Sequence, residues 1–301
     1  MRIAVAATGE VAIPTLNWLC ESVHEIALVI SRPDRPAGRG RNFKSSPVSK
    51  WALENSFPLI CPDSPQELDG AINDLDLVLT IGYGLLVPEN ILKLSRYGFI
   101  NLHFSLLPAY RGAAPVQRAI ENGESETGVT VFALDKGLDT GAIYSSARIE
   151  IQPTWRSADL LPVLAGMGPS VVALAFDAIE NGHAPAPQNG ISSHAPKISK
   201  KEAKIDWNHN AEVILRRIRA FFPHPVAWSD YRGGVFKITA ASLSDEDLAS
   251  GEIQVIDREV VVGCGQGSAI VLKSVISAGK KEMAAMDWAR GARISAGAHF
   301  G

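Results

Sequence analysis

Short apolar runs alternate with helical stretches at the start of the chain, and this alternation restricts the fold more than any other feature. Arg2–Ala7 is apolar and β-prone, Ala12–Ser22 has helical periodicity, and Ile26–Ser31 is the next β-prone run. Strand, helix and strand in this order form a right-handed βαβ unit with parallel strands. We therefore predict an α/β fold with a Rossmann-like, doubly wound and mostly parallel sheet.

The same pattern continues through the first 180 residues. Further helices are predicted over Val48–Asn55, Pro65–Asn73, Ala113–Asn122 and Ser157–Glu180, and strands over Pro58–Cys61, Asp76–Ile81, Phe99–Leu102, Thr127–Leu134 and Ala142–Ile149. Pro162 and Gly168-Pro169 predict a kink or break in the last helix. Arg32–Pro47 contains three prolines and two glycines, and we predict a long loop without regular structure there.

A different pattern begins near residue 203. A helix predicted over Ala211–Ala220 is followed by five short β-prone runs with Gly-containing turns, namely Ala227–Tyr231, Val235–Ala241, Glu252–Asp257, Val260–Gly263 and Ile270–Ser274. This arrangement predicts a small OB-like β-barrel. Because Pro, Gly, Ser and Asn are concentrated before it, we assign residues 1–182 to the α/β domain, 183–202 to a linker and 203–301 to the OB-like domain.

Two polar clusters follow predicted strands of the α/β domain. Asn101 and His103 lie two residues apart at the end of one strand, so their side chains point to the same face. About forty residues later, Asp139 lies in a turn between Gly137 and Gly141, which allow close approach of the backbone. An amide, an imidazole and a carboxylate at neighbouring strand ends suit an oxyanion donor, an acid/base and an orienting group. Capping or core hydrogen bonding is the alternative role for these side chains.

Five spaced motifs resemble the formyltransferase family that uses 10-formyltetrahydrofolate. They are Asn101-Leu102-His103, Ser105-Leu106-Leu107-Pro108, Arg111-Gly112-Ala113-Ala114-Pro115, Thr127-Gly128-Val129-Thr130 and Gly137-Leu138-Asp139-Thr140-Gly141. Three others resemble the methionyl-tRNA formyltransferases of this family in particular: Arg32–Gly40, Ile198–Trp207 and Ala278–Lys281. The likeness extends to about Gly291. It departs at Ala7-Thr8-Gly9, Phe104 and Ala109, where the family usually has Gly-Thr-Pro, a small residue and Arg.

The resemblance implies a formyltransferase fold and transfer of the formyl group of 10-formyltetrahydrofolate to the α-amino group of initiator methionyl-tRNA. It implies that residues 1–182 are the catalytic domain, with Asn101, His103 and Asp139 as catalytic residues, and that the OB-like domain of residues 203–301 binds tRNA. On this hypothesis a protonated His103 and the Asn101 amide stabilise the oxyanion, while Asp139 keeps His103 cationic and accepts the amine proton. The family likeness assigns folate binding to Gly82, Tyr83, Gly84 and Leu85 and to Ser105, Leu106, Leu107 and Pro108. This chemistry needs no metal.

Basic residues are concentrated in two places on a chain whose formal net charge is −3. Residues 32–50 contain six Lys or Arg side chains and a single acid, Asp34. Charge alone fits either a solvated loop or a polyanion contact. The resemblance favours contact with tRNA through Arg39, Arg41 and Lys44. Lys280 and Lys281 follow the last predicted strand and are either solvated or a second tRNA contact.

Composition excludes several other classes of protein. The three cysteines are far apart and the histidines lack metal-site spacing, which argues against a disulfide framework or a zinc site. No Gly-x-Gly-x-x-Gly follows the first strand, and we see no apolar run close to 18 residues. We therefore expect a soluble, cytoplasmic monomer. Two alternatives stay open: a sugar-nucleotide amine formyltransferase with the same folate donor, and an RNA-binding protein with a degenerate α/β domain.

Overall fold

The computed structural model describes residues 1–37 and 42–301 of the chain. The chain folds into two compact units, and each is described by itself. The first unit comprises residues 1–115, 126–150 and 161–196, and the second comprises residues 116–125, 151–160 and 197–301. The predicted boundaries at residues 182 and 203 stay predictions. Each unit combines segments that are distant in the sequence.

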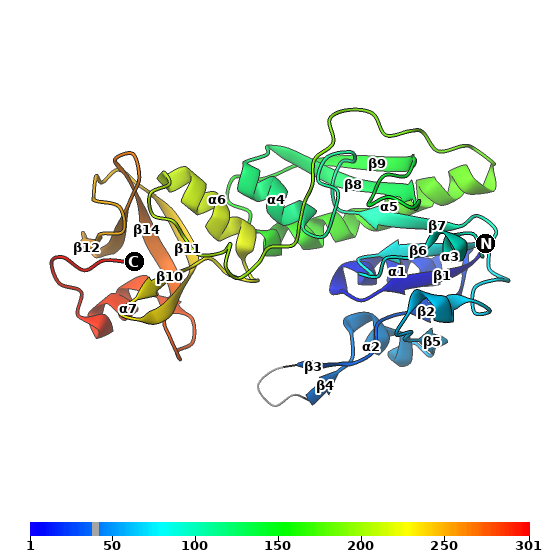
Figure 1. The fold of residues 1–301 in the computed structure, drawn as a ribbon, viewed down its shortest axis with the longest axis horizontal. Coiled ribbons are helices and arrows are strands. Elements are labelled where there is room, and N and C mark those ends of the chain that lie inside the picture. Colours follow the sequence, from blue (N-terminus) through cyan, green and yellow to red (C-terminus); the bar gives the residue numbers. More distant parts are fainter. Residues whose placement is uncertain (38–41) are drawn as a thin grey trace. The chain divides into compact units, whose positions relative to one another are not determined.

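The first unit is built on one seven-stranded sheet (Figure 1). In chain order its strands are β1 (Arg2–Ala7), β2 (Glu25–Ile30), β5 (Leu59–Ile60), β6 (Leu77–Ile81), β7 (Phe99–His103), β8 (Glu126–Ala133) and β9 (Ile143–Glu150). Their spatial order is β5-β2-β1-β6-β7-β8-β9. The first five of these are parallel, whereas β8 and β9 are antiparallel to their neighbours. The predicted mostly parallel α/β sheet is therefore confirmed.

Helices cover both faces of this sheet, as a doubly wound fold requires. They are α1 (Ile13–Glu21), α2 (Pro47–Glu54), α3 (Glu89–Leu92) and most of α5 (Ser157–Glu180), with 3₁₀ helices over Glu10–Ala12 and Pro65–Leu68. A Cβ atom added to Gly168 of α5 would approach Thr15 of α1 to 2.5 Å and Leu102 of β7 to 2.9 Å. Helices α5 and α1 thus pack closely together, and α5 contacts the face of β7 on which Leu102 lies.

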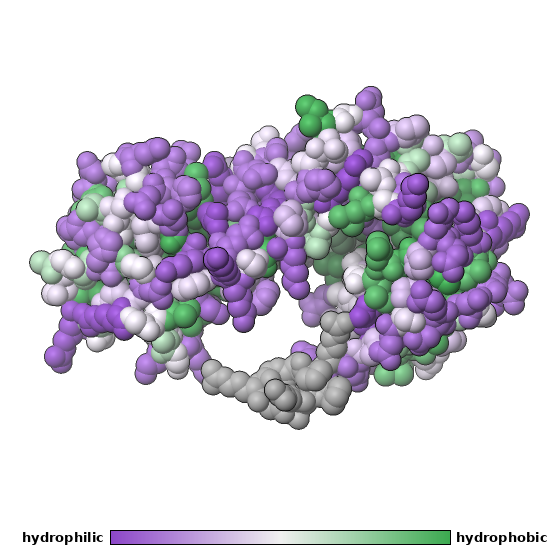
Figure 2. All heavy atoms as spheres, in the orientation of Figure 1, coloured by the Kyte–Doolittle hydropathy of each residue, from purple (hydrophilic) through white to green (hydrophobic). Residues whose placement is uncertain are grey.

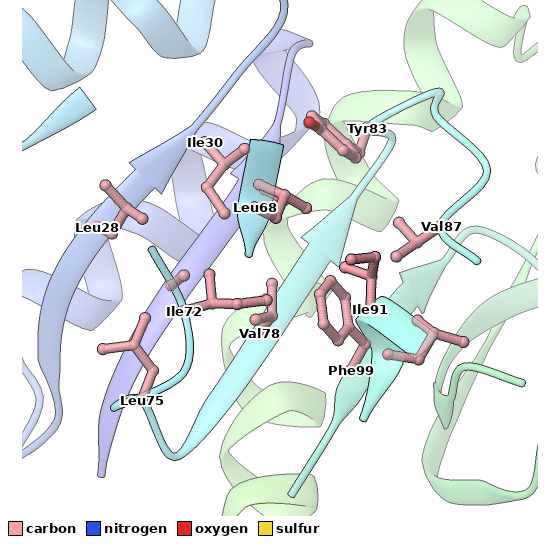
Figure 3. Packing of buried hydrophobic residues seen from close by; sticks show 13 residues of the cluster. Leu28, Ile30, Leu68, Ile72, Leu75, Val78, Tyr83, Val87, Ile91 and Phe99 are labelled. Carbon is pink, nitrogen blue, oxygen red and sulfur yellow. The ribbon is translucent and has the colours of Figure 1, made fainter. Parts of the chain in front are cut away.

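The opposite face of the sheet carries a buried hydrophobic cluster (Figure 3). Its fully buried members include Ile30, Leu68, Ile72 and Val78, with Phe99 of β7 2% exposed. Side chains alternate along a strand, so Phe99, Asn101 and His103 share one face. The hydrophobic cluster therefore lies on the same face of the sheet as Asn101 and His103, next to the C-terminal end of β7.

Helix α5 is long and apolar enough to span a membrane by length and composition alone. Our expectation that no run approaches such a length is therefore wrong for this helix. Its most apolar window is 44% buried, and residues such as Leu164, Val172 and Phe176 are fully buried within the protein. Core helices of soluble proteins have the same length and composition, so α5 is only weak evidence that the chain crosses a membrane.

Three local predictions for the first unit differ from the structure. Residues 32–47 do contain regular structure, because β3 (Arg35–Ala37) pairs antiparallel with β4 (Asn42–Lys44). The helix predicted over Pro65–Asn73 is only a 3₁₀ turn ending at Leu68. Helix α5 continues through Pro162 and Pro169 without interruption.

The second unit contains a six-stranded antiparallel sheet and three helices, α4 (Pro115–Asn122), α6 (Ala211–Phe221) and α7 (Ala285–Ala292). Its strands are β10 (Trp228–Tyr231), β11 (Gly234–Ser244), β12 (Ile253–Ile256), β13 (Glu259–Cys264), β14 (Ser268–Ile276) and β15 (Met283–Ala284). The order β10-β11-β14-β13-β12, with β15 beside β14, gives a half-barrel and confirms the predicted β-rich second domain. Helix α6 matches the prediction, whereas α7 has no counterpart among the predicted elements.

Candidate active site

Two polar side chains at the end of β7, Asn101 and His103, lie on the same face of the strand as the hydrophobic cluster and line a pocket. Asn101 pairs in register with Thr80 of β6, and the Thr80 hydroxyl lies 2.8 Å from Asn101 Oδ1. Because this hydroxyl donates to the amide oxygen, the Asn101 amide nitrogen is left to donate elsewhere. Thr80 therefore orients Asn101 as a hydrogen-bond donor toward the pocket that both residues line.

His103, two residues further along β7, is only 6% exposed. Its Nε2 lies 2.9 Å from the carbonyl oxygen of Tyr110. A carbonyl can only accept, so Nε2 carries the proton, and Nδ1 of the neutral ring has a free lone pair. Burial lowers the pKa of His103 below its ordinary value, and the nearby Asp139 carboxylate opposes this shift only in part. The lowered pKa favours the neutral imidazole over the predicted cationic form.

Asp139 approaches His103 from the loop between β8 and β9. Strand β8 runs antiparallel to β7, so the loop after β8 must fold back along β7 to bring Asp139 to His103. Asp139 Oδ2 lies 3.7 Å from His103 Nδ1 and accepts a 2.7 Å hydrogen bond from the Gly112 amide. The structure thus brings together the imidazole and carboxylate that the sequence predicted, with the lone pair of Nδ1 facing the carboxylate.

The turn that carries Asp139 is tightly constrained. Asp139 has a φ of 52°, in the left-handed region that non-glycine residues seldom occupy. A Cβ atom added to Gly141 would lie 1.7 Å from the Ala133 carbonyl oxygen, and one added to Gly137 would lie 2.0 Å from Thr140 Oγ1. The close approach predicted at these glycines is therefore made to the chain itself. It fixes the conformation of the loop and so the position of the carboxylate.

Gln188 ties this turn to the loop that follows β7, and sequence reasoning missed it. Its side-chain amide donates to the carbonyl oxygens of Asp139 (2.9 Å) and Gly141 (2.8 Å). Its Oε1 accepts two hydrogen bonds from the Arg111 guanidinium, the shorter being 2.6 Å. Gln188 lies in the segment predicted as a linker, where a single polar residue gives no periodic signal. All the hydrogen-bonding capacity of its amide is directed at the site.

The segment around Gln188 is itself bound to the first unit by backbone hydrogen bonds. Ala186 exchanges two with Ile143 of β9, at 2.7 and 2.8 Å. Further along, the Arg111 amide donates to the Ser193 carbonyl and the Ala195 amide donates to the Arg111 carbonyl. Residues 186–195, hereafter the strap, therefore run along the site loop and are not a free connection.

A pocket of about 440 Å³ opens beside these groups. Its lining includes Thr80, Asn101, His103 and Asp139, the loop from Gly82 to Val87, and apolar side chains such as Phe104, Leu92 and Leu134. Hydrophobic residues are visible on this side of the first unit, in the region of the loop after β6 (Figure 2). The pocket therefore combines apolar walls with polar groups that converge at one end, as small-molecule sites do.

The loop from Gly82 to Val87 contributes exposed backbone. Gly82 and Gly84 have φ values of 56° and 75°, and Thr8 Oγ1 holds the loop by donating to the Gly82 carbonyl. Among described residues, the amides and carbonyls of Tyr83–Val87 have no hydrogen-bond partner within the chain. Burial raises the pKa of Tyr83 to about 12, so this phenol is neutral. Unpaired backbone beside an apolar pocket suits a planar ligand with donors and acceptors at its edge.

Of the predicted folate-binding residues, Gly82, Tyr83, Gly84 and Leu85 line the pocket, whereas Ser105–Pro108 do not. The Ser105 hydroxyl donates to the Ala109 carbonyl at 2.6 Å, and the Ser105 carbonyl accepts from Thr130 Oγ1 at 2.7 Å. Leu106 packs so closely on Gly128 of β8 that a Cβ atom there would lie 2.6 Å from it. Polar groups of this segment are thus used to fold the loop beside the pocket, and the role of the four residues in folate binding stays a prediction.

The predicted tRNA-binding residues lie at several exposed positions. Lys44, on β4, and Lys280 and Lys281, between β14 and β15, are all exposed. Arg39 and Arg41 lie outside the described residues. Exposure makes the three lysines accessible to a polyanion, but it is equally compatible with simple solvation.

An α/β sheet that directs an amide donor, a neutral imidazole and a carboxylate into one pocket defines a protein suited to acid–base chemistry at a carbonyl group. Comparison with known families agrees with this class. Residues 1–172 match the formyl transferase family, and residues 197–293 match the formyl transferase C-terminal domain. The chain belongs to the formyl transferase family.

Individual relatives and solved structures show which members of the family this chain is similar to. A methionyl-tRNA formyltransferase of Salinispora tropica is 41% identical over 306 residues, covering 99% of each chain. Among solved structures, WlaRD, a sugar 3N-formyl transferase, aligns with a TM-score of 0.70 at 22% identity, covering 93% of this chain and 99% of that one. HypX from Aquifex aeolicus aligns with a TM-score of 0.68 at 18% identity over 96% of this chain, which spans about half the length of HypX (48%). At such identities the two structures establish the fold alone.

Proposed function

We propose that this protein transfers the formyl group of 10-formyltetrahydrofolate to the α-amino group of initiator methionyl-tRNA. The observation that carries the proposal is the convergence of Asn101, His103 and Asp139 on one pocket in a chain that is 41% identical, end to end, to a methionyl-tRNA formyltransferase. The product is N-formylmethionyl-tRNA for translation initiation.

The pocket residues fit a folate donor. A pterin ring is planar and has donors and acceptors along one edge, which match the unpaired backbone groups of Tyr83–Val87. The apolar walls, including Val87, Leu92 and Leu134, suit the faces of the ring. In one of its solved structures, HypX is in complex with tetrahydrofolic acid. The donor, when bound, supplies the formyl carbon that the amine attacks.

Asn101 is the main candidate for stabilising negative charge on the formyl oxygen. Thr80 holds the amide oxygen, so the amide N–H groups are directed to the pocket before substrate binds. Preorganised donors of this kind contribute about 3–4 kcal/mol to the transition state. Such a donor strengthens its hydrogen bond as charge develops, which is the requirement for raising kcat rather than affinity.

His103 Nδ1 is the candidate proton acceptor. The Tyr110 carbonyl fixes the proton on Nε2, so the lone pair of Nδ1 is available when the attacking amine loses its proton. Asp139, 3.7 Å away, then stabilises the imidazolium without itself being protonated. The imidazolium returns the proton to the folate nitrogen as its bond to the formyl carbon breaks. The N–H proton lost by the amine thus ends on the leaving group, and the charges balance.

The acceptor is assigned to methionyl-tRNA on the strength of the full-length relatives. The same fold also serves WlaRD, a sugar 3N-formyl transferase, so the acceptor must be tested directly. We would incubate the full chain with 10-formyltetrahydrofolate and, in parallel, initiator methionyl-tRNA, elongator methionyl-tRNA or a nucleotide-linked amino sugar. The proposal predicts formylation of the initiator tRNA only. Formylation of the amino sugar with an unmodified tRNA would overturn the assignment.

The remaining parts of the proposal concern the state of the protein. We propose that it acts as a monomer in the cytoplasm, where charged tRNA and folate are both present. Lys44, Lys280 and Lys281 are proposed as tRNA contacts because all three are exposed cations. Sedimentation of the full chain at several concentrations would reveal a dimer, and tRNA footprints that leave these lysines accessible would exclude them as contacts.

A further inference from the structure

Two acceptors compete for the single ring proton of a neutral His103. In a neutral imidazole one nitrogen donates a hydrogen bond and the other accepts one. The Tyr110 carbonyl oxygen lies 2.9 Å from Nε2, and Asp139 Oδ2 lies 3.7 Å from Nδ1. The carboxylate is charged, so by itself it favours a proton on Nδ1. The tautomer with a lone pair on Nδ1 therefore depends on where the Tyr110 carbonyl is held.

Tyr110 has a backbone conformation that needs support from its surroundings. Its φ of 62° lies in the left-handed region, which a bulky side chain seldom occupies, and the residue is buried. Such a conformation persists only where neighbouring groups enforce it. Because peptide groups are planar, the two that flank Tyr110 set the direction of its carbonyl. The contacts of these two peptide groups show what holds them.

Both peptide groups that flank Tyr110 form a hydrogen bond with Ser193 of the strap. The peptide before Tyr110 donates its N–H to Ser193 Oγ at 2.9 Å. The peptide after Tyr110 donates the Arg111 N–H to the Ser193 carbonyl oxygen, also at 2.9 Å. The oxygen of this second peptide is the one that accepts from His103 Nε2. Ser193 therefore fixes the orientation of the peptide group that binds the imidazole.

The strap backbone is attached to the same loop independently of the Ser193 hydroxyl. The Ser193 amide donates to the Pro108 carbonyl at 3.3 Å, and the Ala195 amide donates to the Arg111 carbonyl at 2.7 Å. Ser193 is half-buried, whereas its neighbour Ser192 is exposed. A change of the Ser193 side chain can therefore remove one contact of Tyr110 while the backbone pairing of the strap stays in place.

We propose that Ser193 is a positioning residue, which holds the peptide groups of Tyr110 so that His103 keeps its proton on Nε2 and its lone pair on Nδ1. This inference rests on the proposed function, because that lone pair is the acceptor for the proton of the attacking amine. Ser193 acts through Tyr110 and does not line the pocket. Without the hydroxyl, the Tyr110 carbonyl can turn away from Nε2. The ring proton then resides on Nδ1, facing Asp139, and blocks proton transfer from the amine.

Ser193→Ala in the full chain tests the proposal through its kinetics. We expect kcat for formylation to fall about tenfold, which is the change in an equilibrium that loss of one hydrogen bond produces. KM for the folate donor should stay nearly unchanged, because Ser193 lies outside the pocket. Ser193→Thr keeps a hydroxyl and should recover most of kcat. Ser192→Ala is the matched control, because it removes an exposed serine hydroxyl from the same strap.

The tautomer of His103 is the deciding measurement, because a merely structural role of Ser193 would not move the ring proton. With isotope-labelled histidine, NMR distinguishes a protonated from an unprotonated ring nitrogen, and the spectrum of His103→Gln identifies the signals of His103. At a pH at which the ring is neutral, the wild type and Ser193→Thr should carry the proton on Nε2. Ser193→Ala should show a substantial population with the proton on Nδ1.

Each outcome of these measurements has a distinct meaning. A wild type with the proton on Nδ1 would overturn the inference, and this result does not require any variant to fold. A Ser193→Ala variant that keeps the proton on Nε2 would also overturn it, even if kcat falls. A wild type that formylates no methionyl-tRNA would overturn the proposed function instead, and the tautomers of the wild type and Ser193→Ala would still decide whether Ser193 positions His103.

Discussion

Gln188→Ala tests whether the strap positions the Asp139 carboxylate, which we propose to be catalytic. The change removes both hydrogen bonds to the Asp139 turn and both acceptor contacts of Arg111. A half-buried guanidinium left without its acceptor costs about 1–3 kcal/mol, so the free energy of unfolding should fall by that amount. Asp139 is held at φ 52°, a conformation that costs about 1–3 kcal/mol and persists only where neighbours enforce it.

The consequence for catalysis follows from this geometry. Without Gln188 the Asp139 turn can relax, and a shift of about 1 Å at a reacting group costs about a hundredfold in rate. We therefore expect kcat to fall about 10- to 100-fold with KM for the folate donor nearly unchanged, since Gln188 does not line the pocket. Gln188→Glu keeps the Arg111 contacts but removes the donors to the turn, and it should lose kcat while retaining most of the stability.

Steady-state formylation and urea titration together measure these effects. Asn189→Ala is the control, because Asn189 is exposed and adjacent in sequence. If Gln188→Ala lowers the unfolding free energy but leaves kcat at the wild-type level, the strap is purely structural and the reasoning is refuted. If Gln188→Glu is as active as the wild type, the two carbonyl contacts do not position Asp139.

Further predictions concern the site residues and their ionisation. Asn101→Ala should lower kcat about 10²- to 10³-fold with little change in donor affinity, as measured by single-turnover transfer and folate titration; normal turnover would remove Asn101 from the site. Asp139→Asn should lose most activity while keeping the wild-type melting temperature within a few degrees, and full activity across the pH range would exclude a role in proton handling. Because burial lowers the pKa of His103 in the folded chain, the unfolded chain binds that proton more tightly, and stability should fall as pH drops below about 6.5. His103→Gln should flatten this dependence in urea titrations at pH 7 and pH 5, and an unchanged dependence would contradict the assignment.

Periodic segments of the chain can be predicted because their own pattern determines their structure. β1 and α6 are examples: β1 is a continuous apolar run buried on both faces, and α6 buries one apolar face. The helix predicted over Pro65–Asn73 and the irregular loop predicted over Arg32–Pro47 are wrong. The 3₁₀ turn has four residues and the strands β3 and β4 have three each, which is too short for a periodic pattern to be recognised. Likewise, Pro162 and Pro169 do not break α5, whose packing against α1 and β7 outweighs the local preference.

The candidate site residues can be proposed from motifs, but their protonation states cannot. The family likeness predicts a cationic His103, whereas burial lowers the pKa of this residue. The hydrogen bond to the Tyr110 carbonyl opposes that shift, and in the neutral ring it places the proton on Nε2. Neither effect is visible in sequence, because both depend on the path of the loop after β7. Gln188 contacts Asp139 over 49 residues of chain, and such a long-range hydrogen bond leaves no local pattern.

The central claim is that the cluster at the end of β7 moves a formyl group onto the amine of methionyl-tRNA. The most direct measurement is to react the full chain with 10-formyltetrahydrofolate and charged initiator tRNA and to identify the amino acid released by mild hydrolysis. We predict N-formylmethionine from the wild type and almost none from Asn101→Ala in the same time. Recovery of unmodified methionine from the wild type, with the donor and charged tRNA both intact, would contradict the claim.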